Sequence, residues 1–197
     1  MNVVKISAMD IEYLVVIRES VNLFLKTSAI KYSCNIGKLL DIAPQIHGGA
    51  KSFFPNSIII DTFDIDSESG CNFIGDLCSY NKQIPDNYFD YIVCTEVLEH
   101  VLQPFNAIIE MQRILKPCGL LFITTPFNFR IHGPLPDCWR FTEHGLRVLL
   151  NNFEILELNQ VNTVNRDLMP IHYTIVARKP NSSQHINIIE SYNGDKL

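Results

Sequence analysis

The chain has 197 residues, of which 47% are hydrophobic and 19% charged, and its formal net charge is -5. This composition fits one globular domain with a sizeable core, and no uninterrupted apolar run approaches the roughly 20 residues of a membrane span. The negative charge, without a run of Lys or Arg, argues against nucleic acid or an anionic membrane as a partner.

The N-terminus and the cysteines both favour a cytoplasmic protein. Near Lys5, Asp10 and Glu12 there is no basic region followed by an apolar block and a cleavage site, so the sequence predicts no signal peptide. The six cysteines are scattered singly, without a CxxC pair or a Cys/His group of zinc spacing. We therefore expect reduced thiols that pack as small hydrophobic residues, and no metal site.

The first predicted element is an amphipathic helix over residues 10–26. Apolar residues recur at helical spacing from Asp10 onward, and Asp10 is placed to cap the start of the helix. The helix either covers one edge of a sheet or also helps to roof a substrate pocket, and the sequence leaves both interpretations open. A homodimer is expected if this helix needs a partner to cover it, which a light-scattering mass would decide.

Three predicted strands in the first half of the chain each end in an acid. The strands are expected at residues 37–43, 57–63 and 71–74; Asp41 closes the apolar run of the first, and Asp64 with Asp66 and then Asp76 follow the other two. A turn and then a helix are expected after the first strand, where Pro44 and the pair Gly48-Gly49 follow. Because parallel strands end at one edge of a sheet, the carboxylates would line a ligand-binding edge.

The central strand is predicted at residues 91–94. These residues form a near-continuous apolar run, which is typical of a parallel strand covered by helices on both faces. Four polar side chains follow at once, and they are Thr95, Glu96, Glu99 and His100. Ligands of open α/β sheets bind outside the carboxyl ends of the strands, so chemistry is expected here. Asp90 precedes the strand and is expected to make a turn contact.

The second half alternates helices and strands around one long loop. The expected elements are a helix over residues 104–115, a strand over 120–124, a helix over 142–150, and strands over 153–158 and 172–177. Residues 126–141 are rich in Pro, Asn, His and Gly, hold the only tryptophan, and are too long for a tight turn. We expect them to form a loop at the strand ends. The tail from Pro180 is polar and expected to be frayed.

Three segments together resemble the class I S-adenosylmethionine-dependent methyltransferases. Residues 89–101 are similar to the family's fourth strand and its following Glu-His turn. Residues 115–121 are similar to the start of its fifth strand, with Cys118 where a glycine is usual. Residues 137–142 resemble a Trp-Arg-Phe-Thr loop of small bacterial-type members. The likeness covers about residues 35–179.

The resemblance implies an α/β fold with a Rossmann-like, doubly wound, seven-stranded sheet. The sheet would be mostly parallel with an antiparallel last strand, and helices would cover both faces. The implied organisation is an N-terminal helical segment (1–34), a methyltransferase domain (35–179) and a polar C-terminal tail (180–197).

The resemblance also implies S-adenosyl-L-methionine as the cofactor and S-adenosyl-L-homocysteine as the product. Asp64, or its rival Asp66, is placed to accept both ribose hydroxyls. Asp76 would accept from the adenine amino group, with Leu77 against the ring. The remaining implied cofactor residues are Asp41 with Ala43 and Gly48 at the aminoacyl end, and Thr95 with Glu96 beneath the sulfonium. The alternative is that Asp64 or Asp66 merely caps a turn.

The turn after the first strand departs from the family's glycine-rich pattern. Ala43, Gln45 and His47 stand where glycines are expected. Glycines there let the backbone approach the cofactor closely, so Ala43 and Gln45 would narrow that space. Gly48-Gly49 would restore it with a shifted turn.

The implied activity is methyl transfer to a small-molecule, sugar-containing or peptide acceptor. In the loop, His132 or Asp137 would orient or deprotonate the acceptor and Arg140 would hold an anionic or carbonyl group. The alternative is a structural clasp in which Asp137 pairs with Arg140 and Trp139 packs into the core. A non-catalytic, methyltransferase-like binding or scaffold protein is a second hypothesis. A nicotinamide-dependent oxidoreductase ranks last, because no Gly-x-Gly-x-x-Gly follows the first strand.

Overall fold

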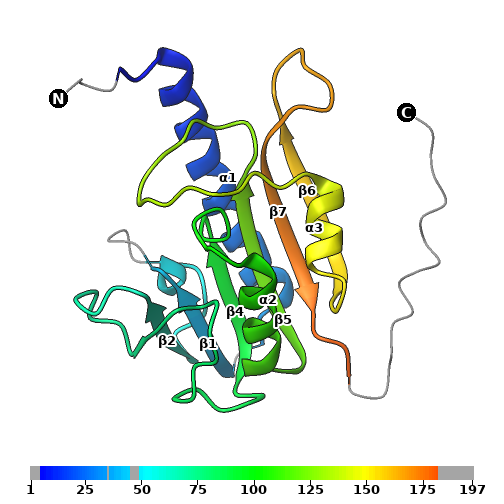
Figure 1. Cartoon of the computed structure of the whole chain (residues 1–197). Helices are drawn as coiled ribbons and strands as arrows, with labels where there is room; N and C mark the ends of the chain where they lie inside the picture. The colour runs from blue at the N-terminus through cyan, green and yellow to red at the C-terminus, as the bar shows by residue number, and fades with distance from the viewer. Residues whose placement is uncertain (1–4, 35, 45–48, 182–197) are drawn as a thin grey trace.

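A single seven-stranded sheet forms the centre of the molecule, with helices on both faces (Figure 1). The structure, a computed structural model, describes residues 5–34, 36–44 and 49–181. In chain order the elements are α1 (Ala8–Tyr32), β1 (Gly37–Ile42), the 3-10 helix η1 (Gly49–Ser52), β2 (Ile58–Asp64), β3 (Phe73–Ile74), β4 (Phe89–Thr95), α2 (Pro104–Ile114), β5 (Leu115–Pro126), α3 (Glu143–Leu149), β6 (Glu154–Asn162) and β7 (Pro170–Arg178).

The strand order is β3-β2-β1-β4-β5-β7-β6. The first five strands pair in parallel, and β7 runs antiparallel to both β5 and β6. This confirms the predicted doubly wound, mostly parallel sheet with an antiparallel last strand. Since β1 to β5 all point the same way, their carboxyl ends share one edge, and that edge positions the site.

The central strands bury both faces, as the apolar run of β4 predicts. On one face α1 packs against the sheet, and Phe122 of β5 lies between Phe24 of α1 and Phe54, with ring centroids 6.3 and 5.8 Å away. On the other face α2 and α3 cover the alternate strand residues. Complete burial of a side chain such as Phe122 stabilises the fold by about 2–3 kcal/mol.

The N-terminal helix is longer than predicted and begins differently. Ser7, not Asp10, is the N-cap: its hydroxyl accepts from the backbone N–H of Asp10, whose carboxylate accepts from the Ser7 N–H in return. Asp10 is thus the third helical residue of a capping box. The outer face of α1 carries exposed apolar side chains, with Leu23 63% and Ile30 78% exposed. The apolar pattern therefore continues beyond the face that packs on the sheet.

The helix predicted after β1 is wrong for the described residues. Residues 45–48, including Gln45, His47 and Gly48, lie outside the described ranges, and η1 then makes one 3-10 turn. Pro55 follows closely, lacks an N–H and disfavours helical backbone at Phe54, so no longer helix fits there. The face of β2 beside η1 consequently has only a short segment over it.

Asp90 also differs from its prediction. It lies within β4 and not in a turn, and its carboxylate accepts from the backbone N–H of Lys38 at 2.8 Å and pairs with Lys116 at 2.9 Å. These contacts join β4 to its two neighbouring strands. The predicted Thr142 cap of α3 is confirmed, because the Thr142 hydroxyl accepts from the N–H of Gly145.

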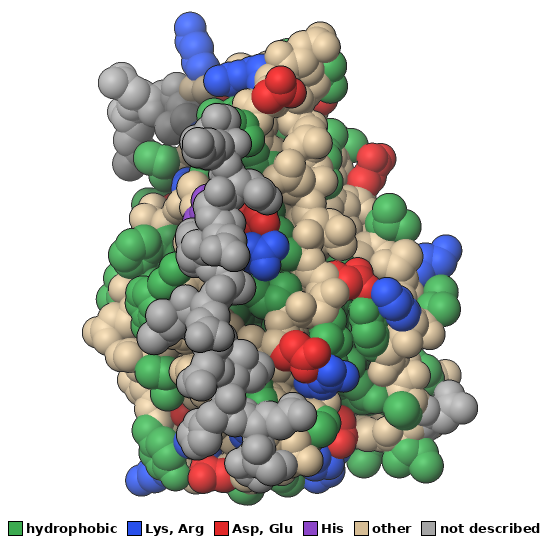
Figure 2. All heavy atoms as spheres, turned by 90° about the vertical axis from the view of Figure 1, so that its right-hand side faces the viewer, with side chains coloured by type: hydrophobic (Ala, Val, Ile, Leu, Met, Phe, Trp, Pro, Cys, Tyr) green, Lys and Arg blue, Asp and Glu red, His purple; other side chains and the backbone are tan. Residues whose placement is uncertain are grey.

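The surface carries no large basic area on the face shown in Figure 2, where Lys and Arg side chains lie interspersed with Asp and Glu. Several cations pair directly with acids, such as Arg147 with Glu143 and Arg178 with Glu154, each at 2.7 Å. All six cysteines are free thiols. The prediction that they pack as small hydrophobic residues is wrong for Cys34, Cys118 and Cys138, which are exposed, whereas Cys94 is buried in the core. Among the described helices, none is long and apolar enough to cross a membrane.

Candidate active site at the carboxyl ends of the strands

Asp64, Asp66 and Asp76 lie at the predicted sheet edge, and each carboxylate also closes a local turn. Oδ1 of Asp64 accepts from the N–H of Asp66, and Oδ1 of Asp66 accepts from that of Glu68, both at 2.9 Å. Oδ1 of Asp76 accepts from the N–H of Cys78 at 2.8 Å. This is the turn geometry of the alternative interpretation. It engages one oxygen of each carboxylate, so a ribose or adenine contact through the other is compatible with it.

Two apolar side chains flank these acids. Leu77 is 6% exposed and belongs to the core, so only its edge is available to a ring. Ile65, which directly follows Asp64, is 72% exposed. The sequence analysis does not single out Ile65, although an apolar residue between two strand-end acids is a usable signal. An exposed aliphatic side chain beside the acid predicted to bind ribose has the character suited to contact with a purine face.

The turn after β1 is organised by Asp41, which is 3% exposed. Its Oδ2 accepts from the backbone N–H of Ala50 at 2.6 Å, which holds η1 against the strand. A Cβ at Gly49 would lie 2.2 Å from that oxygen, so the approach requires glycine. Ala43 adopts a left-handed φ of +50°, the conformation that glycine favours. At Ala43 the backbone thus keeps the conformation of a glycine although the residue is not one.

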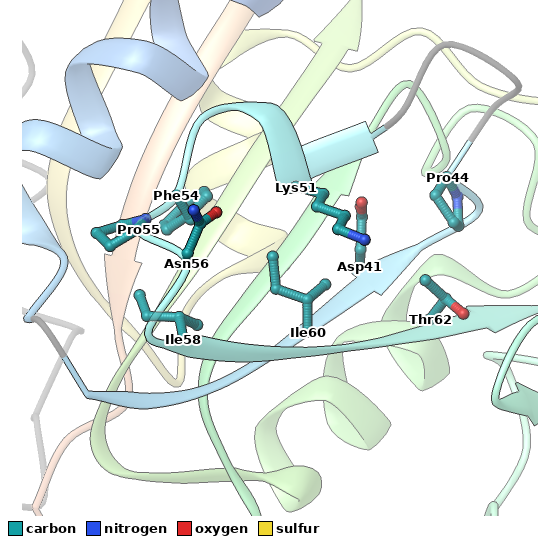
Figure 3. A pocket seen from close by; sticks show the side chains of 9 residues that line it. All are labelled: Asp41, Pro44, Lys51, Phe54, Pro55, Asn56, Ile58, Ile60 and Thr62. Atoms are coloured by element: carbon teal, nitrogen blue, oxygen red, sulfur yellow. The ribbon is translucent and has the colours of Figure 1, made fainter.

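A cavity of about 470 Å³ lies between η1 and β2 (Figure 3). In the figure Lys51 comes from η1 on one side, and Ile58, Ile60 and Thr62 come from β2 on the other. It exists because no full helix covers this part of β2. Of the predicted cofactor residues that the structure describes, Asp41 alone lines it, so the cavity and the strand-end acids Asp64, Asp66 and Asp76 are separate features.

Burial raises the pKa of Asp41 to about 6, although the N–H of Ala50 opposes the shift. A carboxyl whose folded pKa lies above its unfolded value makes the fold less stable as pH rises from about 4 to 6. Asp41→Asn keeps an acceptor for Ala50 and removes a cost of up to about 3 kcal/mol. We expect thermal unfolding several degrees above wild type at pH 7.5 and equal to it at pH 4. The same difference in unfolding temperature between variant and wild type at pH 7.5 and at pH 4 would contradict this.

Glu96 is fixed by side chains from two other strands. Its Oε1 accepts from the hydroxyl of Thr124 at 2.8 Å and lies 2.7 Å from Nε2 of His172, while Nδ1 of His172 lies 2.9 Å from the hydroxyl of Ser20 on α1. Glu96 has a left-handed φ of +54°, which turns the chain at the end of β4 beside Thr95. Sequence reasoning missed His172 and Ser20, which are far from Glu96 along the chain.

The loop after β5 is held together by Asp137. Its carboxylate accepts two hydrogen bonds from the guanidinium of Arg140 and one from the backbone N–H of His132 at 2.9 Å. Burial alone would raise the pKa of Asp137, but these hydrogen bonds outweigh it and lower the pKa to about 2. The pairing matches the clasp interpretation for Asp137 and Arg140. It leaves the imidazole of His132 as the group that can meet an acceptor.

Trp139 does not enter the core as the clasp interpretation expects. Its side chain is 40% exposed, and its indole N–H donates to the carbonyl of Val101 at 2.8 Å. The backbone N–H groups of Cys138 and Trp139 both donate to the carbonyl of Glu99. The loop is therefore bonded directly to the turn after β4, and Figure 1 shows it lying across the ends of β4 and β5.

Glu99 lies fully buried under this contact. Among the described residues, neither of its carboxylate oxygens has a hydrogen-bond partner. Nε2 of His100 and Nε2 of His132 lie 3.7 and 3.8 Å from its Oε1. Burial and the charge of Glu96 raise the pKa of Glu99 well above its ordinary value. Glu99 and His100 lie at the predicted strand end, and their residue types alone indicate no particular role there.

These features define a class of protein: a Rossmann-like enzyme whose parallel strands present acids and a polar loop at one edge. A family described as a methyltransferase domain matches residues 22–190. The match covers most of the chain, which therefore belongs to this family. With its Rossmann-like sheet, the chain is a class I member of this family.

Individual relatives agree with this. Rat thiol S-methyltransferase TMT1B is 51% identical over 96 residues, which are 45% of this chain and 39% of the relative. A methyltransferase from Methanosarcina mazei aligns with a TM-score of 0.56 at 20% identity, over 77% of this chain and 96% of that one. Phosphoethanolamine N-methyltransferase 2 from Haemonchus contortus, solved with S-adenosyl-L-methionine, aligns with a TM-score of 0.60 at 16% identity, over 81% of this chain and 53% of that one. The chain spans less than half the length of the curated relatives it matches.

Proposed function

We propose that the protein transfers the methyl group of S-adenosyl-L-methionine to an oxygen or sulfur nucleophile of a small molecule. The observation that carries this is the loop after β5, which lies across the same strand ends that carry the acids and brings the imidazole of His132 there. The thiol S-methyltransferase relative supports a small acceptor. Sugar-containing and peptide acceptors belong to the same proposal, because they offer the same hydroxyl and thiol nucleophiles.

The cofactor side of the proposed site consists of the acids at the ends of β1 to β3. Asp64 and Ile65 suit a ribose and the face of its base, and Asp76 suits an exocyclic amine. Asp41 and Ala43 shape the turn that approaches the aminoacyl end, and Gly48 belongs to the same proposal although it lies outside the described residues. The cofactor supplies the methyl group and a neutral thioether leaving group.

The acceptor side of the proposed site is built around His132. Its Nδ1 lies 3.1 Å from the Asp137 carboxylate and 3.3 Å from the carbonyl of Arg130, so both neighbours of Nδ1 are hydrogen-bond acceptors. Nδ1 therefore carries the hydrogen and Nε2 has a free lone pair. Burial lowers the pKa of His132, which keeps the ring neutral. This imidazole orients or deprotonates the acceptor, while Arg140 holds Asp137 in place.

A screen of acceptors by product mass tests the proposal. Purified protein is incubated with S-adenosyl-L-methionine and separate sets of small thiols, hydroxyl compounds, sugars and peptides. We expect at least one thiol or hydroxyl compound to gain one methyl group in step with release of S-adenosyl-L-homocysteine. Methylation of nitrogen compounds alone would contradict the proposed acceptor class, and no product with any class would contradict the proposed function.

A further inference from the structure

The group of Glu99, His100 and His132 has the composition of a metal site. One donor atom from each residue lies within 4.8 Å of the other two. The sequence analysis expects no metal site, since no Cys/His group has zinc spacing, and His132 is far along the chain from Glu99 and His100. Folding of the loop over the turn after β4 brings the three together, through the bonds from Cys138 and Trp139 to the Glu99 carbonyl.

The distances within the group fit a shared ion better than direct hydrogen bonds. Oε1 of Glu99 is 3.7 Å from Nε2 of His100 and 3.8 Å from Nε2 of His132. A direct N–H···O bond requires about 2.7–3.2 Å. Two donors that each lie about 2.1 Å from one tetrahedral Zn²⁺ are about 3.4 Å apart. Small movements of two partly exposed rings would close the remaining difference.

Both imidazoles are already oriented as metal ligands. Nδ1 of His100 lies 2.9 Å from the carbonyl oxygen of Pro136, and Nδ1 of His132 lies between the Asp137 carboxylate and the carbonyl of Arg130. Oxygen acceptors at Nδ1 place the hydrogen on that atom, so both Nε2 lone pairs face Glu99. Ligand histidines in metal sites ordinarily donate their other N–H to a carbonyl or carboxylate in this way.

A bound cation would also give the buried carboxylate of Glu99 the partner that it lacks among the described residues. Its carboxylate is 0% exposed and without a hydrogen-bond partner among the described residues, and such a group is costly unless it is paired, protonated or bound to a metal. Arg140 does not serve, because its guanidinium is taken by Asp137. The histidine side chains are 14% and 22% exposed, which leaves the group a route from solvent.

We propose that Glu99, His100 and His132 bind one divalent transition-metal ion of the Zn²⁺ type. Two imidazoles and one carboxylate are a donor set suited to Zn²⁺, Co²⁺, Mn²⁺ and Fe²⁺, and three protein ligands leave a position open. If methyl transfer is as proposed, that position takes the acceptor's oxygen or sulfur, and the metal lowers its pKa so that its proton leaves to water. His132 is then a ligand and not the base. The assignment of the acceptor rests on the proposed function, whereas the metal site does not.

Direct metal binding tests the site without turnover. The full chain is stripped with a chelator and titrated with Co²⁺, followed by its visible absorption, and then with Zn²⁺ as competitor. We expect one equivalent bound per chain, with affinity at least tenfold weaker in His100→Ala, His132→Ala and Glu99→Gln. His144→Ala, on α3, and Cys138→Ser are matched controls that should bind as wild type does. Binding that is absent, or unchanged in all three ligand variants, would overturn the site.

Measurements on S-adenosyl-L-methionine separate this proposal from the proposed function. Cofactor binding is measured by calorimetry on stripped and Zn²⁺-loaded protein, and turnover with the identified acceptor on both. A metal site with no turnover for any acceptor would keep the metal proposal and remove the function. Equal turnover in stripped and loaded protein would keep the function and remove the metal's role in it.

Discussion

Replacing Asp64 by Ala is expected to weaken binding of S-adenosyl-L-methionine by about a hundredfold. The carboxylate stands at the end of β2, and we propose that it accepts both ribose hydroxyls. Hydrogen bonds to a charged group contribute about 1.5–3 kcal/mol each, and a hundredfold loss corresponds to about 2.7 kcal/mol. Calorimetric titration of the variant with the cofactor measures the change.

Two further variants control for the turn that Asp64 closes. Asp64→Asn keeps an oxygen for the N–H of Asp66 but loses the charge, and it should still lose at least tenfold in cofactor affinity. Asp66→Ala removes only an exposed carboxylate that closes the next turn, so its affinity should change less than threefold. A large loss in Asp66→Ala with a small loss in Asp64→Ala would instead make Asp66 the ribose ligand.

His132→Ala is expected to lower turnover about a hundredfold or more while leaving cofactor binding intact. The imidazole faces Glu99 and the open side of the loop, whether it acts as base or as metal ligand. Loss of acid-base or metal chemistry at an acceptor has this size, and we expect it in kcat because the proposed cofactor contacts do not include His132. Single-turnover kinetics with the acceptor found in the screen measures it.

Asp137→Asn tests the same role of the loop at the residue that contacts His132. The variant loses the ion pair with Arg140 but keeps an oxygen for the His132 N–H, so cofactor binding should persist and turnover should fall as well. Unchanged turnover in both His132→Ala and Asp137→Asn would mean that the loop has a structural role only. A loss of folding in Asp137→Asn would likewise make Asp137 a structural clasp and not part of the chemistry.

The sheet could be predicted from sequence because its strands carry local signals. The apolar run of β4 and the acids that close β1 and β2 give both the parallel pairing and the active edge. The short 3-10 turn after β1 could not be predicted in this way. Pro44 and the glycines indicate a turn and the start of a helix, but they do not indicate that Pro55 ends it so soon. Local patterns report where an element begins more reliably than how long it lasts.

The side-chain partners of the site were beyond sequence reasoning for a different reason. Glu96 meets His172, and Glu99 meets His132, only because β7 inserts between β5 and β6 and the loop folds back. No periodicity encodes a contact between residues so far apart in the chain. Residue type alone named His132 and Asp137 as candidates, whereas the buried, unpartnered state of Glu99 is visible only in three dimensions.

Calorimetric titration of the wild-type chain with S-adenosyl-L-methionine tests the central claim most directly. The account predicts saturable heat with one equivalent of cofactor per chain, competition by S-adenosyl-L-homocysteine, and no heat with NAD⁺ or NADH. Absence of heat with S-adenosyl-L-methionine, in a sample that shows one cooperative thermal unfolding transition, would contradict it.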